Sequence, residues 1–278
     1  MTAAAEKQGE TDTKNATFWN ELCGSGLARS LGITDRTPDS LGKFDEAYMA
    51  MYPYLLGYVT TNDLAGKRVL EIGLGYGTLG QIIALRGGQY HGLDIADGPV
   101  EMMRYRLERL GMESRDRVTK GSALDIPYPD GSFDYVYSIG CLHHTGNLPK
   151  AVSEVHRVLA SGGTAVVMLY KRYSFRQLAS LRTALVWEIL SRRRASFGEA
   201  VRARYDSNDA GEAAPHTDFV SRSDVRRRLF DRFSRVRIDV QNFDGYVLFR
   251  GRLVIPREKL LTNIARFLGT DLYVVATK

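Results

Sequence analysis

The chain has 278 residues, of which 44% are hydrophobic and 25% charged, as is usual for a globular protein. Its two cysteines are too few for a disulfide framework, and no apolar run approaches the ~18 residues of a membrane span. A net charge of +6 fits anionic partners without requiring them. These features predict a soluble cytoplasmic protein with no membrane partner.

The first 60 residues are expected to form a helical layer. Residues 1 to about 15 are small and polar, and we expect them to be frayed. From Ala16 to Gly32 the apolar spacing is helical but is interrupted by glycines, which predicts two short helices joined by a turn. The segment Phe44 to Tyr58 predicts a helix rich in tyrosine. Its aromatic residues fit core packing; the alternative is a lid whose tyrosines reach a bound ligand.

The next hundred or so residues alternate between strand and helix patterns. The expected strands are Arg68–Ile72, Gln89–Asp94, Val118–Ser122, Phe133–Ile139 and Thr164–Tyr170. The expected helices are Thr78–Arg86, Pro99–Leu110 and Leu148–Leu159. This alternation predicts an α/β fold with a doubly wound, mostly parallel sheet and helices on both faces.

The alternation breaks after Tyr170. The expected elements are a helix at Ser174–Leu190, a helix from Ser221 or Ser223 to Phe233, a strand at Ser234–Gln241, a helix at Pro256–Leu268 and a strand at Asp271–Thr277. We therefore expect a core formed by residues 61–170 and 221–278, an N-terminal helical lid at 1–60, and an inserted substrate cap at 171–220.

A glycine-rich turn follows the first predicted strand, with glycines at positions 73, 75, 77 and 80. A strand, a glycine turn and a helix N-terminus together form a ligand site, because the backbone can approach the ligand closely. Gly75 to Gly80 reads G-x-G-x-x-G, and Asp94 lies where a ribose-binding acid is expected, which fits a nicotinamide-dependent oxidoreductase. Glu71, however, suits a ligand with an ammonium group better than a pyrophosphate.

The run Glu71-x-Gly73-x-Gly75-x-Gly77 resembles the first motif of class I S-adenosylmethionine-dependent methyltransferases. Gly121 to Asp134 resembles the third-strand motif of that family, most closely the branch that includes the quinone-biosynthesis methyltransferases. Together with a Glu-x-x-Arg-x-Leu-x-x-Gly-Gly segment at 154–163, the resemblance covers residues 68 to about 170. It implies a Rossmann-like seven-stranded sheet whose last strand lies antiparallel beside the fifth.

The resemblance also implies S-adenosyl-L-methionine as cofactor, with S-adenosyl-L-homocysteine as product. Glu71 and the glycine turn would hold the methionyl end, Asp94 the ribose, and the segment from Ser122 the adenine. Ser122 stands where the family usually has an acid, and Asp125 is an alternative partner for the adenine. The expected cofactor-binding residues are Glu71, Gly73, Gly75, Gly77, Asp94, Ile95, Ser122, Ala123, Leu124 and Ser138.

Three histidines are candidates for a general base in methyl transfer. His143 and His144 follow the fourth strand, where the family places its methyl-transfer centre, and His216 lies in a later loop. His144 is preferred, and the alternative is a structural role for each histidine. No carboxylate or thiol is spaced to complete a metal site with the adjacent pair, so no metal is expected.

Sixteen Lys or Arg residues stand against eight Asp or Glu between Lys171 and Arg237. This excess fits either a solvated surface or attraction of an anionic substrate. The sequence thus predicts methyl transfer to oxygen, nitrogen or carbon of a small molecule of bacterial secondary or cofactor metabolism, with anionic acceptors among the candidates. A nicotinamide-dependent oxidoreductase and an RNA-directed methyltransferase are the alternatives. A homodimer is compatible with the sequence.

Overall fold

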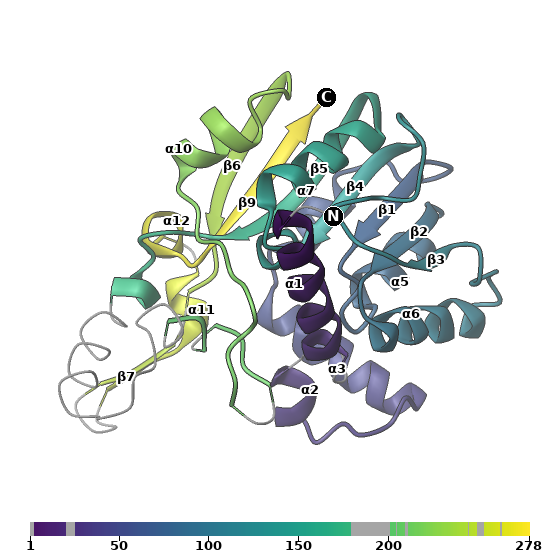
Figure 1. The fold of residues 1–278 in the computed structure, drawn as a ribbon. Helices are drawn as coiled ribbons and strands as arrows, with labels where there is room; N and C mark the ends of the chain where they lie inside the picture. The colour runs from purple at the N-terminus through teal and green to yellow at the C-terminus, as the bar shows by residue number, and fades with distance from the viewer. Residues whose placement is uncertain are drawn as a thin grey trace.

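The computed structural model describes residues 3–20, 26–178, 201–203, 205–208, 211–243, 245–248, 253–261 and 263–278. Its centre is a seven-stranded sheet with the strand order β3-β2-β1-β4-β5-β9-β6 (Figure 1). The strands are β1 Arg68–Ile72, β2 Gln89–Asp94, β3 Val118–Lys120, β4 Phe133–Ile139, β5 Leu159–Tyr170, β6 Arg235–Gln241 and β9 Asp271–Thr277. The predicted doubly wound, mostly parallel sheet is confirmed.

The direction of the last strand is also as expected. β1 to β5 pair in parallel, whereas β9 runs antiparallel between β5 and β6. β9 pairs with β5 over its whole length, from Thr277 opposite Thr164 to Asp271 opposite Tyr170.

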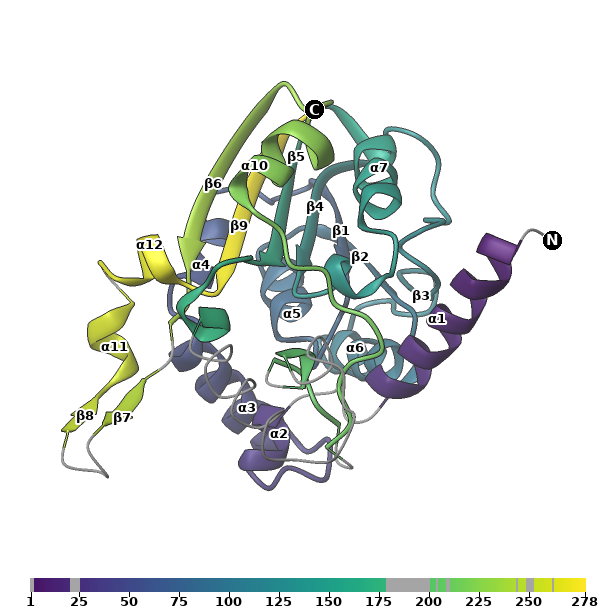
Figure 2. The same ribbon diagram turned by 60° about the vertical axis from the view of Figure 1, so that its left-hand side comes forward.

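The helices are placed as follows. Before the sheet come α1 Ala3–Trp19, α2 Gly26–Ser30, α3 Pro38–Met51 and α4 Leu55–Thr60. Within the alternating region lie α5 Thr78–Leu85, α6 Asp97–Arg109, the 3-10 turn η2 Leu142–His144 and α7 Leu148–Val158. After it come α10 Arg222–Asp224, the π-helical turn η3 Val225–Leu229, α11 Arg257–Leu260 and α12 Ala265–Leu268. In Figures 1 and 2, α2 and α3 lie below the sheet, beyond the ends of the parallel strands.

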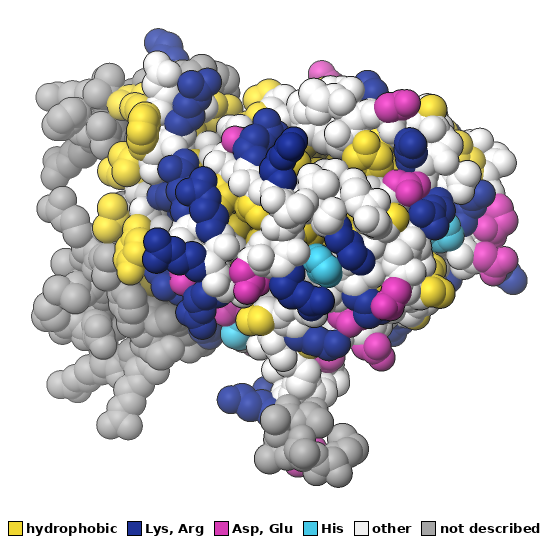
Figure 3. Space-filling model, turned by 90° about the horizontal axis from the view of Figure 1, so that it is seen from above, with side chains coloured by type: hydrophobic (Ala, Val, Ile, Leu, Met, Phe, Trp, Pro, Cys, Tyr) yellow, Lys and Arg dark blue, Asp and Glu magenta, His cyan; other side chains and the backbone are white. Residues whose placement is uncertain are grey.

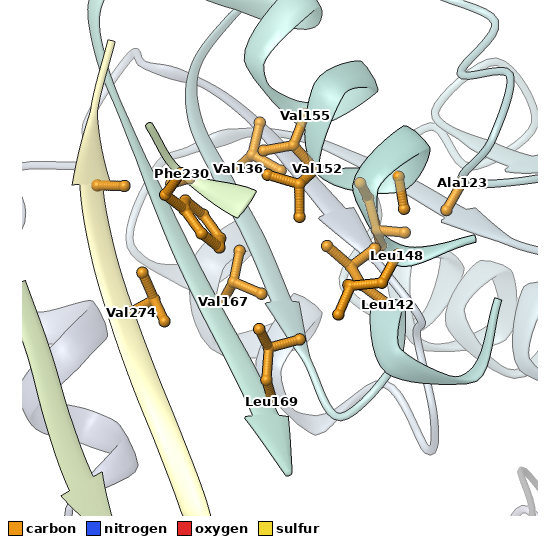
Figure 4. Packing of buried hydrophobic residues seen from close by; sticks show 14 of the residues in the cluster. Ala123, Val136, Leu142, Leu148, Val152, Val155, Val167, Leu169, Phe230 and Val274 are labelled. Carbon is orange, nitrogen blue, oxygen red and sulfur yellow. The ribbon is translucent and has the colours of Figure 1, made fainter. Parts of the chain in front are cut away.

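The two faces of the sheet are covered by different helices, because successive strand residues point to opposite sides. Leu70 and Val136 join a core cluster with α7 and with Phe230, close to η3 (Figure 4). Val69 and Tyr137 join a second cluster that includes residues of α4, α5 and α6. Two covered faces explain why the parallel strands read as almost continuous apolar runs.

Several local expectations differ from the structure. Fraying was expected up to about residue 15, but residues 3–19 form the helix α1. Phe44–Tyr58 is divided between α3 and α4, and Pro256–Leu268 is divided between α11 and α12. β5 begins at Leu159, so the glycines at 162 and 163 lie within a strand. A hairpin of β7 Tyr246–Leu248 and β8 Leu253–Ile255 was not expected.

The described part of the predicted cap is limited to residues 171–178, 201–203, 205–208 and 211–220. Most of the helix expected at Ser174–Leu190 therefore lies outside the described residues. The division into lid, core and cap stays a prediction. Among the helices that the structure describes, none has the length and apolar character needed to cross a bilayer.

The basic residues from α10 to β6 lie at the surface. Figure 3 shows Lys and Arg side chains gathered on the left half of the molecule as seen from above. The arginines at 222, 226, 227, 228, 232, 235 and 237 are all exposed. None of them lines the cavity described next.

Candidate active site

A cavity of about 270 Å³ opens at the carboxyl edge of the parallel strands. It is lined by residues that follow β1, β2, β3 and β4, together with residues of α1 and α3. β1 lies between β2 and β4, so the chain leaves the sheet in opposite directions on the two sides of this point. In open α/β sheets such a reversal is the usual place for a ligand.

The glycine turn after β1 forms one wall of the cavity. Gly73 has φ 82°, and a Cβ there would lie 2.3 Å from the Cβ of Cys141, so glycine is needed for the turn to pack on the loop after β4. Gly75 has φ 51°, lines the cavity, and would present a Cβ to no protein atom within 4 Å. The free space at Gly75 is therefore cavity, where a ligand can approach the backbone closely.

Glu71 lies at the floor of the cavity and is only 2% exposed. Tyr90 donates a hydrogen bond from its hydroxyl to Oε2 of Glu71 at 2.6 Å. Burial raises the pKa of Glu71 to about 8, with opposing contributions from Tyr90 and Arg106. The carboxyl group is therefore mostly protonated at neutral pH, and a bound cation would favour its ionised form.

Asp94 ends β2 and lines the cavity. The backbone N–H of Leu74 donates to its Oδ2 at 2.8 Å, and the N–H of Ala96 donates to its Oδ1 at 2.9 Å. Burial raises its pKa to about 6, although these backbone hydrogen bonds oppose the shift. Both carboxylate oxygens are held in place, and each keeps a lone pair that could accept a hydrogen bond from a ribose hydroxyl.

The predicted adenine segment is only partly at the cavity. Ser122 and Ala123 line it, and Ile95 joins them from the end of β2. Leu124 packs in the core, and its backbone N–H donates to Oγ of Ser122 at 3.2 Å. Asp125 is exposed and does not line the cavity, so its position does not support the alternative adenine contact.

Two further predicted cofactor residues support the site from outside the lining. Gly77 is the N-cap of α5 with φ 80°, and a Cβ there would lie 2.7 Å from Cδ of Arg106. Ser138 is fully buried and donates from Oγ to the backbone oxygen of Ile72 at 2.9 Å. Neither residue lines the cavity, and direct contact of either with the cofactor stays a prediction.

His144 is the one of the three candidate bases that lines the cavity. Its Nδ1 lies 2.8 Å from the backbone oxygen of His216, which can only accept a hydrogen, so Nδ1 carries the proton. Nε2 is then the unprotonated nitrogen, and it lies 3.6 Å from Oδ2 of Asp206. Burial lowers the pKa of His144, and Asp206 partly opposes this shift. The neutral imidazole is therefore able to accept a proton.

The other two histidines are placed differently from the expectation. His143 is fully buried outside the cavity lining, with its ring against Tyr170 and its pKa lowered well below the usual value by burial. His216 contributes its backbone carbonyl, whereas its Nε2 lies 3.2 Å from Oδ2 of Asp218. Neither imidazole reaches the cavity, so the position of neither supports a role as base.

Several cavity residues were not anticipated from the sequence. Asn15 and Trp19 come from α1, Asp206 from the cap region, and Tyr170 from the end of β5. No local motif marks these residues, and only the tyrosine-rich segment gave a signal, since Tyr48 and Tyr52 also line the cavity.

The charges in the cavity lining are one-sided. Its acidic residues are Asp12, Glu71, Asp94 and Asp206. Within the described part of the chain, no Lys or Arg contributes to the lining. The described residues also contain no group of three His, Cys, Asp or Glu side chains arranged to hold a metal ion.

Part of the chain matches a family of known proteins. Residues 70–167 match the family model described as "Methyltransferase domain". The chain is 35% identical over 103 residues to ajmaline N-methyltransferase of Rauvolfia serpentina, covering 37% of this chain and 35% of that protein. It is 32% identical over 131 residues to demethylmenaquinone methyltransferase of Tropheryma whipplei (strain Twist), covering 42% of this chain and 53% of that protein. The matched region thus spans about half of these relatives or less.

The fold is shared with magnesium protoporphyrin IX methyltransferase from Synechocystis PCC 6803, solved with bound SAH. The TM-score is 0.57 at 13% identity, and the match covers 96% of this chain and 99% of that chain. At this identity the match shows a shared fold only. The motifs, the sheet order and the family match agree. Residues 70–167 therefore form a methyltransferase domain of the class I, S-adenosylmethionine-dependent type.

Proposed function

We propose that this protein transfers a methyl group from S-adenosyl-L-methionine to a small molecule bound in the cavity. The observation that carries the proposal is the meeting of the glycine turn, Glu71 and Asp94 in one cavity at the strand reversal. These groups fit the cofactor chemically. A bound cation would favour the ionised form of Glu71, and the Asp94 carboxylate is oriented to accept hydrogen bonds from hydroxyl groups. The open space at Gly75 lets a ligand approach the backbone closely.

Each end of the cofactor would be held by a different element. Glu71 would bind the ammonium group of the methionyl end, beside the turn from Gly73 to Gly75. Asp94 would bind the ribose hydroxyls, and Ser122 and Ala123 would contact the adenine. Gly77, Leu124 and Ser138 would act by packing, since they do not line the cavity.

The bound sulfonium supplies an already activated methyl group, so the chain has to align the acceptor, exclude water and remove a proton where the acceptor needs it. His144 is placed for the proton transfer, because Nδ1 is held by a carbonyl and Nε2 has a free lone pair. Trp19 and Tyr170 line the cavity beside His144, and such apolar rings help to exclude water.

The relatives support a small-molecule acceptor but not one atom or pathway, since their names include an alkaloid N-methyltransferase and a quinone methyltransferase. They come from a plant and a bacterium, and the bacterial context stays a prediction. The RNA-directed alternative is not favoured, because the exposed arginines of α10 to β6 do not line the cavity.

Calorimetry with S-adenosylhomocysteine and, separately, with NADH tests the proposal. We expect S-adenosylhomocysteine to bind and Asp94→Asn to weaken that binding by about 10- to 100-fold, because hydrogen bonds to a charged group contribute ~1.5–3 kcal/mol. Asp125→Asn is the matched control, since Asp125 is exposed and outside the lining. Binding of NADH alone, or equal affinity in wild type and Asp94→Asn, would contradict the proposal.

A further inference from the structure

We infer that the methyl acceptor is an amine that enters the cavity as an ammonium ion, with Asp206 as its counter-ion and His144 as the base that removes its proton. The inference rests on the proposed methyl transfer and names the substrate class of that site. It replaces the expectation of an anionic acceptor.

Three buried hydrogen-bond acceptors at the cavity receive no hydrogen bond from the described residues. They are Oδ1 of Asn15, Nε2 of His144 and Oδ2 of Asp206. An unpaired buried acceptor is costly, and the cost is removed when a ligand donates to it. A primary ammonium ion has three N–H groups, one for each of these atoms, whereas a carboxylate or phosphate offers no donor in its fully ionised form.

Each of these side chains is anchored through its other polar atom. Asn15 donates from Nδ2 to the backbone oxygen of His144 at 2.8 Å. Asp206 accepts at Oδ1 from the hydroxyl of Tyr170 at 3.2 Å. His144 is held through Nδ1 by the carbonyl of His216. The free acceptors are therefore fixed in orientation, as expected of a preformed binding site.

The surroundings favour a cation over an anion. Asp12 and Asp206 contribute carboxylates here, and no described Lys or Arg lines the cavity. Among nearby cations, Arg29 donates to the backbone oxygen of Ser207, and Arg176 lies over the ring of Tyr205. Aromatic rings complete the subsite: Trp19 lies 4.8 Å from the His144 ring, and Tyr170 lines the cavity. A carboxylate beside aromatic faces is a favourable site for an ammonium ion.

The proton balance of the reaction follows from this arrangement. One N–H proton of the ammonium passes to Nε2 of His144, which frees the nitrogen lone pair. That pair forms the new N–C bond while the C–S bond of the methyl donor breaks, and its electrons remain on sulfur. The imidazolium formed at His144 lies beside Asp206, 3.6 Å away, and later releases its proton to solvent.

The pH dependence involves more groups than these two. The titratable groups that face His144 are His143, Tyr170, Asp206, His216 and Asp218. Burial lowers the pKa of His143 and of His144 and raises the pKa of Tyr170, so these three side chains favour their neutral forms.

The first experiment measures transfer of labelled methyl groups to arylalkylamines and to alcohols and carboxylates of the same shape, such as 2-phenylethylamine, 2-phenylethanol and 3-phenylpropanoate. We expect amines to be methylated and Asp206→Asn to raise KM for them by about 10-fold or more. Glu212→Gln makes the same charge change at an exposed site outside the cavity and should leave KM unchanged.

A preference for carboxylates or alcohols would overturn the inference, as would amine turnover that Asp206→Asn does not affect. Transfer to none of the amines, in a protein that still binds S-adenosylhomocysteine, would overturn the substrate class and leave the cofactor proposal intact. Failure to bind S-adenosylhomocysteine would instead reject the proposed function itself.

The second experiment tests the base by its pH profile. His144→Gln should lower kcat/KM for an amine about 10²-fold at pH 7, because general-base catalysis contributes factors of this size. The deficit should shrink to a few-fold near pH 9.5, where more of the amine is already unprotonated. His156→Gln is the control, since it makes the same substitution on α7, outside the cavity lining. A deficit that is the same at both pH values would overturn the role of His144.

Discussion

Glu71 lies in an environment that its sequence motif does not reveal. The motif identifies an acid before the glycine turn, but the structure buries that acid beside Tyr90 and keeps its carboxyl group mostly protonated at neutral pH. A buried carboxyl group with a raised pKa and a cavity above it is a typical feature of a functional site.

The raised pKa makes a prediction about stability. The unfolded chain releases the Glu71 proton near pH 4.5 and the folded protein near pH 8, so folding stability from this group falls as the pH rises between those values. Glu71→Gln lacks this titration, so the free energy of unfolding of the wild type should decrease relative to the variant by about 3 kcal/mol between pH 5 and pH 8.

Urea unfolding of both cofactor-free proteins at pH 5 and pH 8 measures this difference. Asp94 also has a raised pKa, but it is present in both proteins and cancels in the comparison. Parallel pH dependences for wild type and variant would show that Glu71 is ionised in the folded protein.

Substitution of Gly75 should affect both the stability of the protein and its affinity for the ligand. With φ 51° and no atom within 4 Å of an added Cβ, Gly75→Ala should cost about 1–2 kcal/mol of backbone strain. The methyl group would occupy cavity space, so we expect S-adenosylhomocysteine affinity to fall by more than about 10-fold as well.

Gly66→Ala is the matched control for this substitution. Gly66 has φ 69°, equally open space around it, and a position outside the cavity. Calorimetry and thermal unfolding should show a similar loss of stability in the two variants and a loss of binding only in Gly75→Ala. Equal binding by both would mean that the ligand does not approach the turn.

At the scale of elements, α1 is the clearest departure from expectation. Its sequence is polar, and an isolated helix of that kind is marginal in water, which is why fraying was expected. The helix is held by contacts with the turn after β4: Gln8 donates to the backbone oxygen of Thr145, and Asn15 donates to that of His144, each at 2.8 Å. These long-range contacts leave no local signal in the sequence.

Removal of the Asn15 amide should therefore loosen the substrate side of the cavity. We expect Asn15→Ala to raise KM for the methyl acceptor about 10-fold or more and to change the Kd of S-adenosylhomocysteine little, because Glu71 and Asp94 remain in place. Steady-state kinetics and calorimetry measure the two effects.

Thr13→Ala is the control on the exposed side of α1, where the hydroxyl bonds only within the helix. Thr13→Ala should leave both constants unchanged. An unchanged KM in Asn15→Ala would mean that α1 does not position the acceptor.

For the whole molecule, the bounds of the strands were predictable where the short-range pattern of apolar residues agrees with the topology of the sheet. β1, β2, β4 and β9 have the predicted bounds, because their apolar runs are buried on both faces and end at glycine or polar turns. The antiparallel place of β9 followed from family resemblance and is confirmed by its pairing with β5.

The cofactor side of the cavity was more predictable than the substrate side for the same reason. Glu71, Gly75 and Asp94 belong to motifs that are contiguous in sequence, whereas Asn15 and Asp206 meet at His144 from segments 129 and 62 residues distant. Short-range motifs encode the cofactor cradle, while only the folded chain brings the acceptors of the substrate subsite together.

A crystal structure of the protein with S-adenosylhomocysteine tests the central claim most directly. We predict that the ligand lies across the carboxyl ends of β1 and β2, with its ribose hydroxyls bonded to Asp94, its amino group near Glu71 and its sulfur facing the side of His144. A ligand bound elsewhere, or a ribose that does not contact Asp94, would contradict the account.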